Sequence, residues 1–549
     1  MIRRAFVSVG GQQIHLRYAG RGPAVVLVHR APTSSRTLDL QTEAFARAGF
    51  LALAMDIPGL GHSDPLPLPR PEIGDLAETF HDTLNALGLG RVALYGSHTG
   101  ALICADFAAA YPERVSALLI DGYPIYDAKE RARIVAGYFP SNEVRWDGSH
   151  LLWLWFRYRE QHLFWPWNVP GEVTQAKCDV PDPEYIHEGT VDLLRAGASY
   201  QSPYAAAFRC ESGGLAQRLR VPTYFLAYPD DSLSGGLALL GTLPSTCRIE
   251  HMPRDRAAGV AREVELLRAH AGDRAEPRLS SVSLGTGINR SYVDVTGGQL
   301  ALRSAGSGGD RPLIVVPPIP GSSSMLVAEI EAFSRDRQVI AIDVPGCGNS
   351  DAPNTSGIGS MARVMEQAIE RLGIDDFDLY ALNGGCAVAV EILARRGSGA
   401  TTLILESPVK PHVALADYAA RYAPPIVPRW DGGHLIALWH MTRNRRLFRP
   451  WFDQRLAVRS IGAAAVRLEP NSINREVLAC LESWRTYSSA WQAVLEHPTL
   501  ERVRSFRRQV ILAAQESDEF FDPSLDRLPE ALLPRVSRMR ELLKSGGSA

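Results

Sequence analysis

A histidine at the junction of a predicted strand and a predicted helix is the first candidate for chemistry. His98 follows the strand Arg91–Gly96 and precedes the apolar helical stretch TGALICADFAAAYP. An imidazole can exchange a proton near pH 7, and the partial positive charge of a helix N-terminus disfavours the imidazolium. His98 is therefore predicted to be neutral and to act as a general base or nucleophile. The alternative is a histidine that caps the helix or fills a pocket.

Other titratable side chains could assist His98. Asp230 and Asp231 end a predicted strand and loop, VPTYFLAYPDD, and Asp231 is expected to orient a histidine unless it is a solvated loop carboxylate. His251 lies in the next predicted strand, CRIEHMP, as a catalytic base or as an edge-strand histidine. We place His98 and Asp231 first, with Asp230 and His251 as second choices for the same roles.

The motif RWDG-x-H-L occurs twice and contributes His150 and His434. In a structural interpretation, its tryptophans Trp146 and Trp430 pack inside the fold and its aspartates cap helices. In a functional interpretation, both histidines face a ligand pocket. The structural interpretation is favoured, and His150 is kept as a candidate that assists His98.

This motif is one of four that repeat along the chain. The repeats begin at Val7 and Val293, Asp56 and Asp343, Arg145 and Arg429, and Leu163 and Leu447. Their common order and nearly constant spacing indicate a duplication. One domain is predicted over residues 1–272 and a second over 288–549, joined by a polar, Gly/Ser-rich linker at 273–287.

Alternating strands and helices would bring these side chains together. The apolar strands expected in the first half are Pro23–His29, Gly49–Asp56, Arg91–Gly96 and Val115–Gly122. An amphipathic helix is expected between the second and third of them. This alternation predicts an α/β fold, with a mainly parallel sheet flanked by helices in each half. Aromatic-rich helical caps are expected over residues 125–215 and 408–495, above the carboxyl edge where such sheets bind ligands.

Four segments together resemble the α/β-hydrolase superfamily, in the branch of epoxide hydrolases and haloalkane dehalogenases. They are the strand ending in His29-Arg30, the loop DIPGLGHSD, the turn YGSHTGA and the loop AYPDD, and the resemblance covers almost the whole chain twice. It implies two tandem α/β-hydrolase folds. It also implies a nucleophile at the strand–helix turn, flanked two residues away on each side by small residues.

The turn departs from that family pattern in both halves. Gly96 and Gly100 flank His98, so a histidine holds the nucleophile position. Ser97 is adjacent, but its own neighbours two residues away are a tyrosine and a threonine, which are too bulky. In the second half Asn383 holds the position, and an amide is not a usable nucleophile.

The resemblance also implies an oxyanion site of backbone N–H groups after the first core strand. His29 and Arg30 stand there in the first half, and Arg30 adds a cation. The second half has Pro317-Pro318, and proline has no N–H to donate. It also has no histidine after His497. The carboxylates at the position of the triad acid in the second half are Glu516 and Asp518.

These features predict an atypical enzyme without a serine nucleophile. His98 would move a proton with help from Asp231 or His150, on a small hydrophobic molecule, in hydrolysis or in a lyase, isomerase or cyclase reaction. The residues expected to bind the substrate or an oxyanion are His29, Arg30, Ser97, Thr99 and Trp153. The second domain would be structural. The alternatives are a non-catalytic tandem pseudoenzyme that binds a ligand or acts as a scaffold, and a Ser97 that acts through a distorted turn.

Composition narrows the possible partners. The net charge is −2, with 21% charged and 46% apolar residues. The sequence shows no basic stripe of the kind that binds a nucleic acid, so a nucleic-acid partner is not expected. Seven dispersed cysteines without metal spacing fit a reducing compartment. We expect a cytoplasmic protein without a signal peptide, membrane span, metal or organic cofactor. Its two domains should pack within one chain, and a homo-oligomer is possible.

Overall fold

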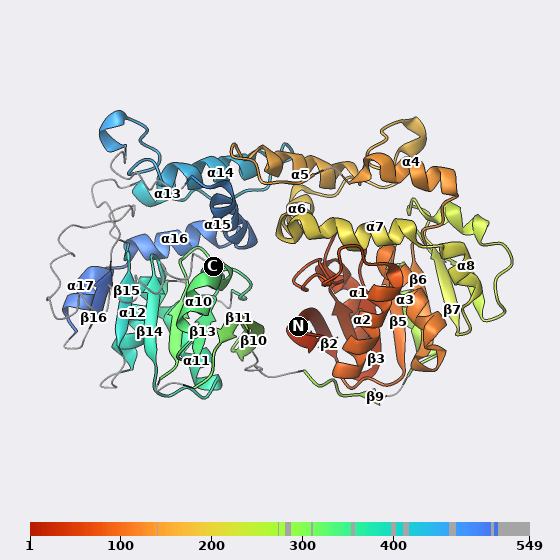
Figure 1. Cartoon of the computed structure of the whole chain (residues 1–549), viewed down its shortest axis with the longest axis horizontal. Coiled ribbons are helices and arrows are strands. Elements are labelled where there is room, and N and C mark those ends of the chain that lie inside the picture. The colour runs from red at the N-terminus through yellow and green to blue at the C-terminus, as the bar shows by residue number, and fades with distance from the viewer. Residues whose placement is uncertain are drawn as a thin grey trace. The chain divides into compact units, whose positions relative to one another are not determined.

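Two compact units make up the chain, which is described by a computed structural model. The units are Met1–Glu143 with His150–Ser280, and Val144–Ser149 with Ser281–Ala549. Each contains one β-sheet surrounded by helices (Figure 1). The structure describes residues 1–139, 141–272, 274–279, 287–308, 311–352, 357–396, 402–409, 417–459, 468–506 and 510–513.

The sheet of the first unit has the order β1-β2-β4-β3-β5-β6-β7-β8, with β9 paired to β3. β2 is antiparallel to both of its neighbours, whereas β4 to β8 and β3 are mutually parallel. Its strands are β1 Arg3–Val9, β2 Gln12–Gly20, β3 Gly22–Val28, β4 Leu51–Met55, β5 Val92–Ser97, β6 Val115–Asp121, β7 Thr223–Ala227, β8 Cys247–His251 and β9 Arg274–Ala275. The central strands are buried on both faces, which explains their nearly continuous apolar sequence.

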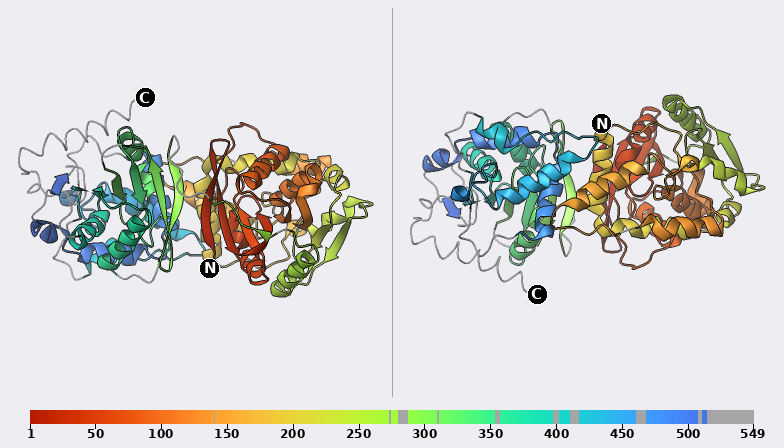
Figure 2. Two further views of the ribbon diagram at one scale, coloured as in Figure 1. Left: turned by 90° about the horizontal axis from the view of Figure 1, so that it is seen from below. Right: turned by 90° about the horizontal axis from the view of Figure 1, so that it is seen from above.

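Helices cover both faces of this sheet (Figure 2). They are α1 Asp39–Arg47, α2 Ile73–Ala86, α3 Thr99–Ala110 and α9 Arg256–Arg268. α1 contacts α9, and α2 contacts α3. One core cluster joins Val25 and Leu27 of β3 to Phe45 of α1 and Leu267 of α9. Burial of such side chains is the main stabilising term of the fold.

The cap of the first unit lies over the ends of the strands (Figure 1). Its helices are α4 Ala128–Tyr138, α5 Ser149–Glu160, α6 Pro183–Ala196, α7 Gln201–Arg209 and α8 Ser212–Gln217. Asp182 caps α6 by accepting a hydrogen bond from the backbone N–H of Tyr185. No helix among the described residues is both long and apolar enough to cross a membrane.

The second unit repeats this plan with the order β10-β11-β13-β12-β14-β15-β16. Its strands are β10 Asn289–Val295, β11 Gly298–Ala305, β12 Leu313–Val316, β13 Val339–Ile342, β14 Asp378–Leu382, β15 Leu403–Glu406 and β16 Val510–Ala513. The helices are α10 Val327–Phe333, α11 Ile358–Arg371, α12 Gly385–Arg395, α13 Tyr418–Tyr422, α14 Gly433–Arg445, α15 Pro470–Glu482, α16 Tyr487–Glu496 and α17 Thr499–Arg504. The predicted α/β class, with mainly parallel sheets flanked by helices, is confirmed in both units.

Candidate active site

The turn between β5 and α3 places His98 in a backbone conformation that few side chains adopt. Its φ is 49° and its ψ is −105°. The glycines on either side make this turn possible. A Cβ on Gly96 would lie 2.6 Å from the Gly100 carbonyl oxygen, and one on Gly100 would lie 2.1 Å from the Val28 carbonyl oxygen. The glycine spacing recognised in the sequence is therefore a steric requirement of this sharp turn.

The imidazole of His98 faces the carboxylate of Asp231, which follows β7. The His98 Nε2 atom lies 3.6 Å from Asp231 Oδ1, and the two side chains are 26% and 12% exposed. Asp231 Oδ1 accepts a hydrogen bond from the Leu233 N–H. Its Oδ2 atom is buried and has no hydrogen-bond partner in the described part of the chain. Two residues that are distant in sequence thus lie within ion-pair distance of each other at this turn.

Gly122, just after β6, creates the space in which this pair meets. Its φ is 71°. A Cβ there would lie 2.4 Å from the His98 Nε2 and Cδ2 atoms and 2.7 Å from Asp231 Oδ2. The backbone beside it also holds the turn, because the His98 N–H donates to the Asp121 carbonyl. Sequence reasoning noted this glycine only as the end of a strand.

Electrostatics keep the His98 ring neutral. Burial is the leading cause that lowers the pKa of His98, and the Arg30 guanidinium adds to it. Asp231 and Asp121 act in the opposite direction but do not reverse the shift. The direction agrees with the expectation from the sequence, although burial rather than the helix dipole is the leading cause. A neutral imidazole with Nε2 toward Asp231 leaves Nδ1 for a substrate.

Arg30 extends from the end of β3 toward the cap. Its Nη2 atom donates a hydrogen bond to the Tyr185 hydroxyl at 3.0 Å, and no carboxylate of the described chain forms an ion pair with it. Burial is the largest single influence on the pKa of Tyr185 and raises it, but the Arg30 charge, the hydrogen bonds with Tyr158 and Arg30, and the Arg36 charge together lower it overall. Burial, followed by Arg30 and Arg157, lowers the pKa of His162 to about 3. This side of the site therefore carries the Arg30 guanidinium, which has no carboxylate partner among the described residues, beside the neutral ring of His162.

An aromatic cavity borders His98 on its other side. The aromatic residues that line it are Tyr126, Trp165, Tyr204 and Phe208. Thr99 lines it as well, as predicted, together with Ala31, Pro124, Ala207 and Leu233. The cavity volume is about 20 Å³, room for about one water molecule. A larger ligand would require the cap to shift.

Several predicted site residues lie outside this cavity. Ser97 is the last residue of β5 and is only 4% exposed. Trp153 packs edge-to-face on Trp167, so Trp165 rather than Trp153 supplies the indole of the lining. His150 is buried at the start of α5, and it does not line the cavity either.

The second choices for the acid and the base also lie away from His98. Asp230 precedes Asp231 but forms no described ion pair with His98. His251 is exposed at the end of β8, the edge strand of the sheet. Asp231 is thus the carboxylate that the structure brings to His98.

The side chain of His29 has a structural role and does not bind a ligand, because both ring nitrogens form hydrogen bonds within the protein. Its ring is fully buried, and its Nδ1–H donates to the Arg30 carbonyl at 3.0 Å. The Ile57 N–H donates to Nε2, also at 3.0 Å. A donor can approach Nε2 only if that nitrogen carries no proton, so this ring is neutral. Burial lowers the pKa of His29, in agreement with that geometry.

The pH dependence of the unfolding free energy should show that the His29 ring stays neutral in the folded protein. Below about pH 6.5 the unfolded chain protonates His29 and the folded chain does not, so the unfolding free energy should fall as the pH decreases. The expected slope for this one group is up to about 1.4 kcal/mol per pH unit. Urea unfolding between pH 7.5 and 5 measures it. His29→Gln, which keeps an acceptor, should flatten the slope. The exposed-site control His251→Gln should not, and equal slopes in both variants would contradict the assignment.

The repeated RWDG motif is structural, but not as first interpreted. Asp147 accepts a hydrogen bond from the Ser149 N–H and Asp431 accepts one from the Gly433 N–H, so each aspartate binds the first backbone N–H of a helix, although Gly432 rather than Asp431 holds the N-cap position of α14. The tryptophans do not pack inside: Trp146 is 71% exposed and Trp430 is 56% exposed. That part of the prediction is wrong. Both copies of the motif therefore place an aspartate at the start of a helix.

Arg256, at the exposed start of α9, contacts a carboxylate and an aromatic ring of the first unit. Arg256 lies 3.6 Å from the Asp121 carboxylate and 4.6 Å from the centre of the Tyr228 ring. Asp121 also accepts a hydrogen bond from Tyr95 at 2.6 Å. Burial is the leading cause that raises the pKa of nearby Glu263 to about 7. Arg256 thus links Asp121, at the end of β6, to the ring of Tyr228.

The second unit keeps the turn without the pair. Asn383 has a φ of 46°, and a Cβ on Gly385 would lie 2.2 Å from the Pro317 carbonyl oxygen. The residue equivalent to Gly122 is Ser407, which also has a positive φ. His497 is bound to Glu391 at 3.1 Å, in a different place. The predicted acids Glu516 and Asp518 lie outside the described residues.

One further group of titratable side chains lies close together on the surface of the first unit. The cluster Glu78, His81 and Asp82 on the surface of α2 has ligand atoms close enough for a metal. It lies away from the turn, and exposed acidic groups of this kind are common without a metal. His98 and Asp231 remain the centre of the site.

A family model described as the alpha/beta hydrolase fold matches residues 23–150 and 311–546, which together are more than half of the chain. The chain belongs to the α/β-hydrolase family. The matches fall in both halves, so the tandem arrangement expected from the repeats agrees with them.

Curated relatives of this α/β-hydrolase share only short stretches with it. Proline iminopeptidase of Heyndrickxia coagulans is 31% identical over 121 residues, which are 21% of this chain and 42% of the peptidase. Bifunctional epoxide hydrolase 2 of Sus scrofa is 36% identical over 109 residues, 20% of each chain. The chain thus matches less than half of the length of either relative. The solved bromoperoxidase of Bacillus anthracis aligns over 49% of this chain and 99% of its own, with 17% identity and a TM-score of 0.39.

Proposed function

We propose that the first unit is an enzyme that acts on a small, largely apolar molecule by proton transfer at His98, without a serine nucleophile. The observation that carries this proposal is the facing pair of His98 and Asp231 beside an aromatic cavity. An apolar lining with a few convergent polar groups is typical of small-molecule sites.

The neutral His98 ring is suited to remove a proton from a substrate or a water molecule through Nδ1. The Asp231 carboxylate would stabilise the imidazolium that forms, as a carboxylate does beside the histidine of a catalytic triad. Arg30 and nearby backbone N–H groups would hold a developing anion. These roles suit hydrolysis, and they equally suit a lyase, isomerase or cyclase step. The second unit, with an amide at the same turn, would be structural.

A second candidate is a non-catalytic ligand-binding protein. The small volume of the cavity, about 20 Å³, favours this alternative because it leaves no room for a substrate in the present arrangement of the cap. Catalysis would require the cap to open, whereas a structural role would not.

A serine-directed fluorophosphonate probe should not label the protein. Ser97 is buried at the end of a strand and lies one residue before the sharp turn. Intact mass measurement after probe treatment checks this, with a serine esterase as positive control. The same preparation would be screened for turnover of small apolar esters, epoxides and carbonyl compounds. Labelling at Ser97 would replace the proposal with ordinary serine chemistry, and no turnover of any substrate would favour the ligand-binding protein.

A further inference from the structure

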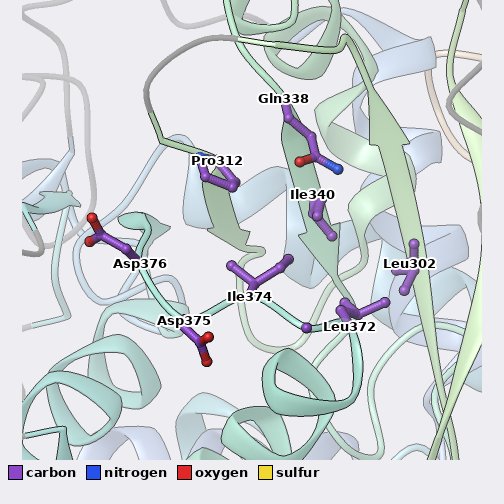
Figure 3. Close-up of a pocket in the computed structure, with 9 residues that line it drawn as sticks. Leu302, Pro312, Gln338, Ile340, Leu372, Ile374, Asp375 and Asp376 are labelled. Carbon is purple, nitrogen blue, oxygen red and sulfur yellow. The ribbon is translucent and has the colours of Figure 1, made fainter.

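A cavity of about 380 Å³ lies in the second unit, at the amino ends of the strands (Figure 3). This edge of the sheet is opposite to the turn between β14 and α12. The floor is apolar, with Leu302 of β11, Ile340 of β13, and Leu372 and Ile374 from the segment after α11. Figure 3 shows Asp375 at one side of these residues. The volume is large enough for several side chains, and it is far larger than the cavity at His98.

The first unit covers the equivalent surface with its own chain. Strand β9 pairs antiparallel with the beginning of β3, where Ala275 lies opposite Gly22. Farther along the same segment, the Arg278 N–H donates to the Leu87 carbonyl at 2.9 Å. A Cβ on Gly88 would lie 3.2 Å from Arg278 Nε, so this side chain lies over the glycine. An extended segment with an arginine therefore fills this place in the first unit.

The repeat makes the two places comparable residue by residue. Leu87-Gly88 follow α2 in the first unit as Leu372-Gly373 follow α11 in the second. Both glycines have a positive φ, of 69° and 71°. Gly373 lines the open cavity, whereas Gly88 lies under an arginine. The Leu-Gly turn after the helix is thus kept in the second unit.

Charge at the rim points to a basic occupant. The positions of Gly90 and Arg91 in the first unit hold Asp375 and Asp376 in the second. Asp376 pairs with Arg311 at 2.8 Å. Asp375 is exposed, and its carboxylate forms no ion pair within the described residues, while its backbone carbonyl accepts a hydrogen bond from the Arg396 side chain at 2.8 Å.

We propose that this cavity is a docking site for an extended, arginine-bearing peptide segment of a partner protein. The peptide backbone would follow the beginning of β12, as β9 follows β3. Its arginine would lie over Gly373 with the guanidinium at Asp375, while apolar side chains of the peptide enter the floor. Apolar anchors beside a charged rim are a common basis of peptide recognition.

A labelled peptide with the sequence of residues 273–280, DRAEPRLS, is the probe, titrated into the full chain by fluorescence polarisation. We expect saturable binding, and hydrogen exchange should slow at 338–340 and 372–376. The same peptide with alanine at the position of Arg278 should bind at least about tenfold more weakly. Asp375→Asn should weaken binding about twofold to fivefold, the range for an exposed ion pair. Asp417→Asn, which removes an equal exposed charge outside the cavity, should leave binding unchanged.

Three outcomes would overturn the proposal. The first is no saturable binding at millimolar peptide. The second is equal binding of the arginine-free peptide or equal weakening by both aspartate variants. The third is exchange protection in the first unit instead of at 372–376. Free arginine methyl ester that competes as strongly as the peptide would also overturn it, because the cavity would then be a small-cation site.

Discussion

A serine in place of Gly122 should reduce turnover about 100-fold or more, to the level of His98→Gln. A Cβ at this position would lie 2.4 Å from the His98 ring and 2.7 Å from Asp231 Oδ2, so His98 must leave its place. General acid–base catalysis by one side chain commonly contributes about 100-fold or more. Serine is the informative choice because Ser407 stands at the equivalent position of the second unit, where Asn383 replaces the histidine.

The matched control is Gly11→Ser. Gly11 has a φ of 83°, and a Cβ there would meet nothing within 4 Å. Both variants carry the backbone cost of a side chain at positive φ, about 1–3 kcal/mol. Activity should survive in Gly11→Ser alone. Urea unfolding and circular dichroism establish that both variants fold. Equal activity in the two would show that His98 is not the group that reacts.

Turnover should decline as the pH falls, with a midpoint below about 6.5, because the lowered pKa of His98 keeps the free base down to that range. Arg30→Met removes a cation that lowers the pKa of His98, so the midpoint should move up. Asp231→Asn removes the carboxylate that raises it, so the midpoint should move down. The plateau should also fall in Asp231→Asn, because the imidazolium loses its partner.

Two measurements check these opposite shifts. One is the pH profile of kcat/KM, which reports groups of the free enzyme. The other is the NMR titration of the His98 ring, which needs no substrate. Arg36→Met is the matched control, since Arg36 lies near Asp192 and Glu188 instead. A rate that declines as the pH rises through this range would mean that His98 acts as an acid, contrary to the proposal.

The sequence predicted the fold, and it located two side chains that meet in the structure, because both rest on local patterns. Glycines two residues before and after His98 define its turn, and the carboxylate after β7 meets it because parallel strands end at one edge. Apolar runs marked β3 to β6 within a few residues of their observed bounds.

The remaining features depend on contacts that local patterns do not encode. Gly122 matters only because two distant side chains converge on it. Choosing between Trp153 and Trp165 required the orientation of each cap element, because the two side chains have the same apolar character in the sequence. Tyr185 meets Arg30 across a sequence separation of 155 residues. The prediction for Trp146 failed because the sequence of a repeated motif does not show whether its tryptophan is buried in the core or exposed.

Strand β9 lies in the stretch that the sequence marked as a mere joint between the two repeats. It pairs with β3, and the Arg278 that follows it closes the surface beside Gly88. The boundary of the duplicated gene segment and the boundary of the folded body therefore differ. A recombination that replaced everything after the first repeat would also remove β9, which is part of the first sheet. Residues 274–279 therefore belong to the fold of the first unit. Their sequence is constrained by packing as well as by the length needed to connect the two repeats.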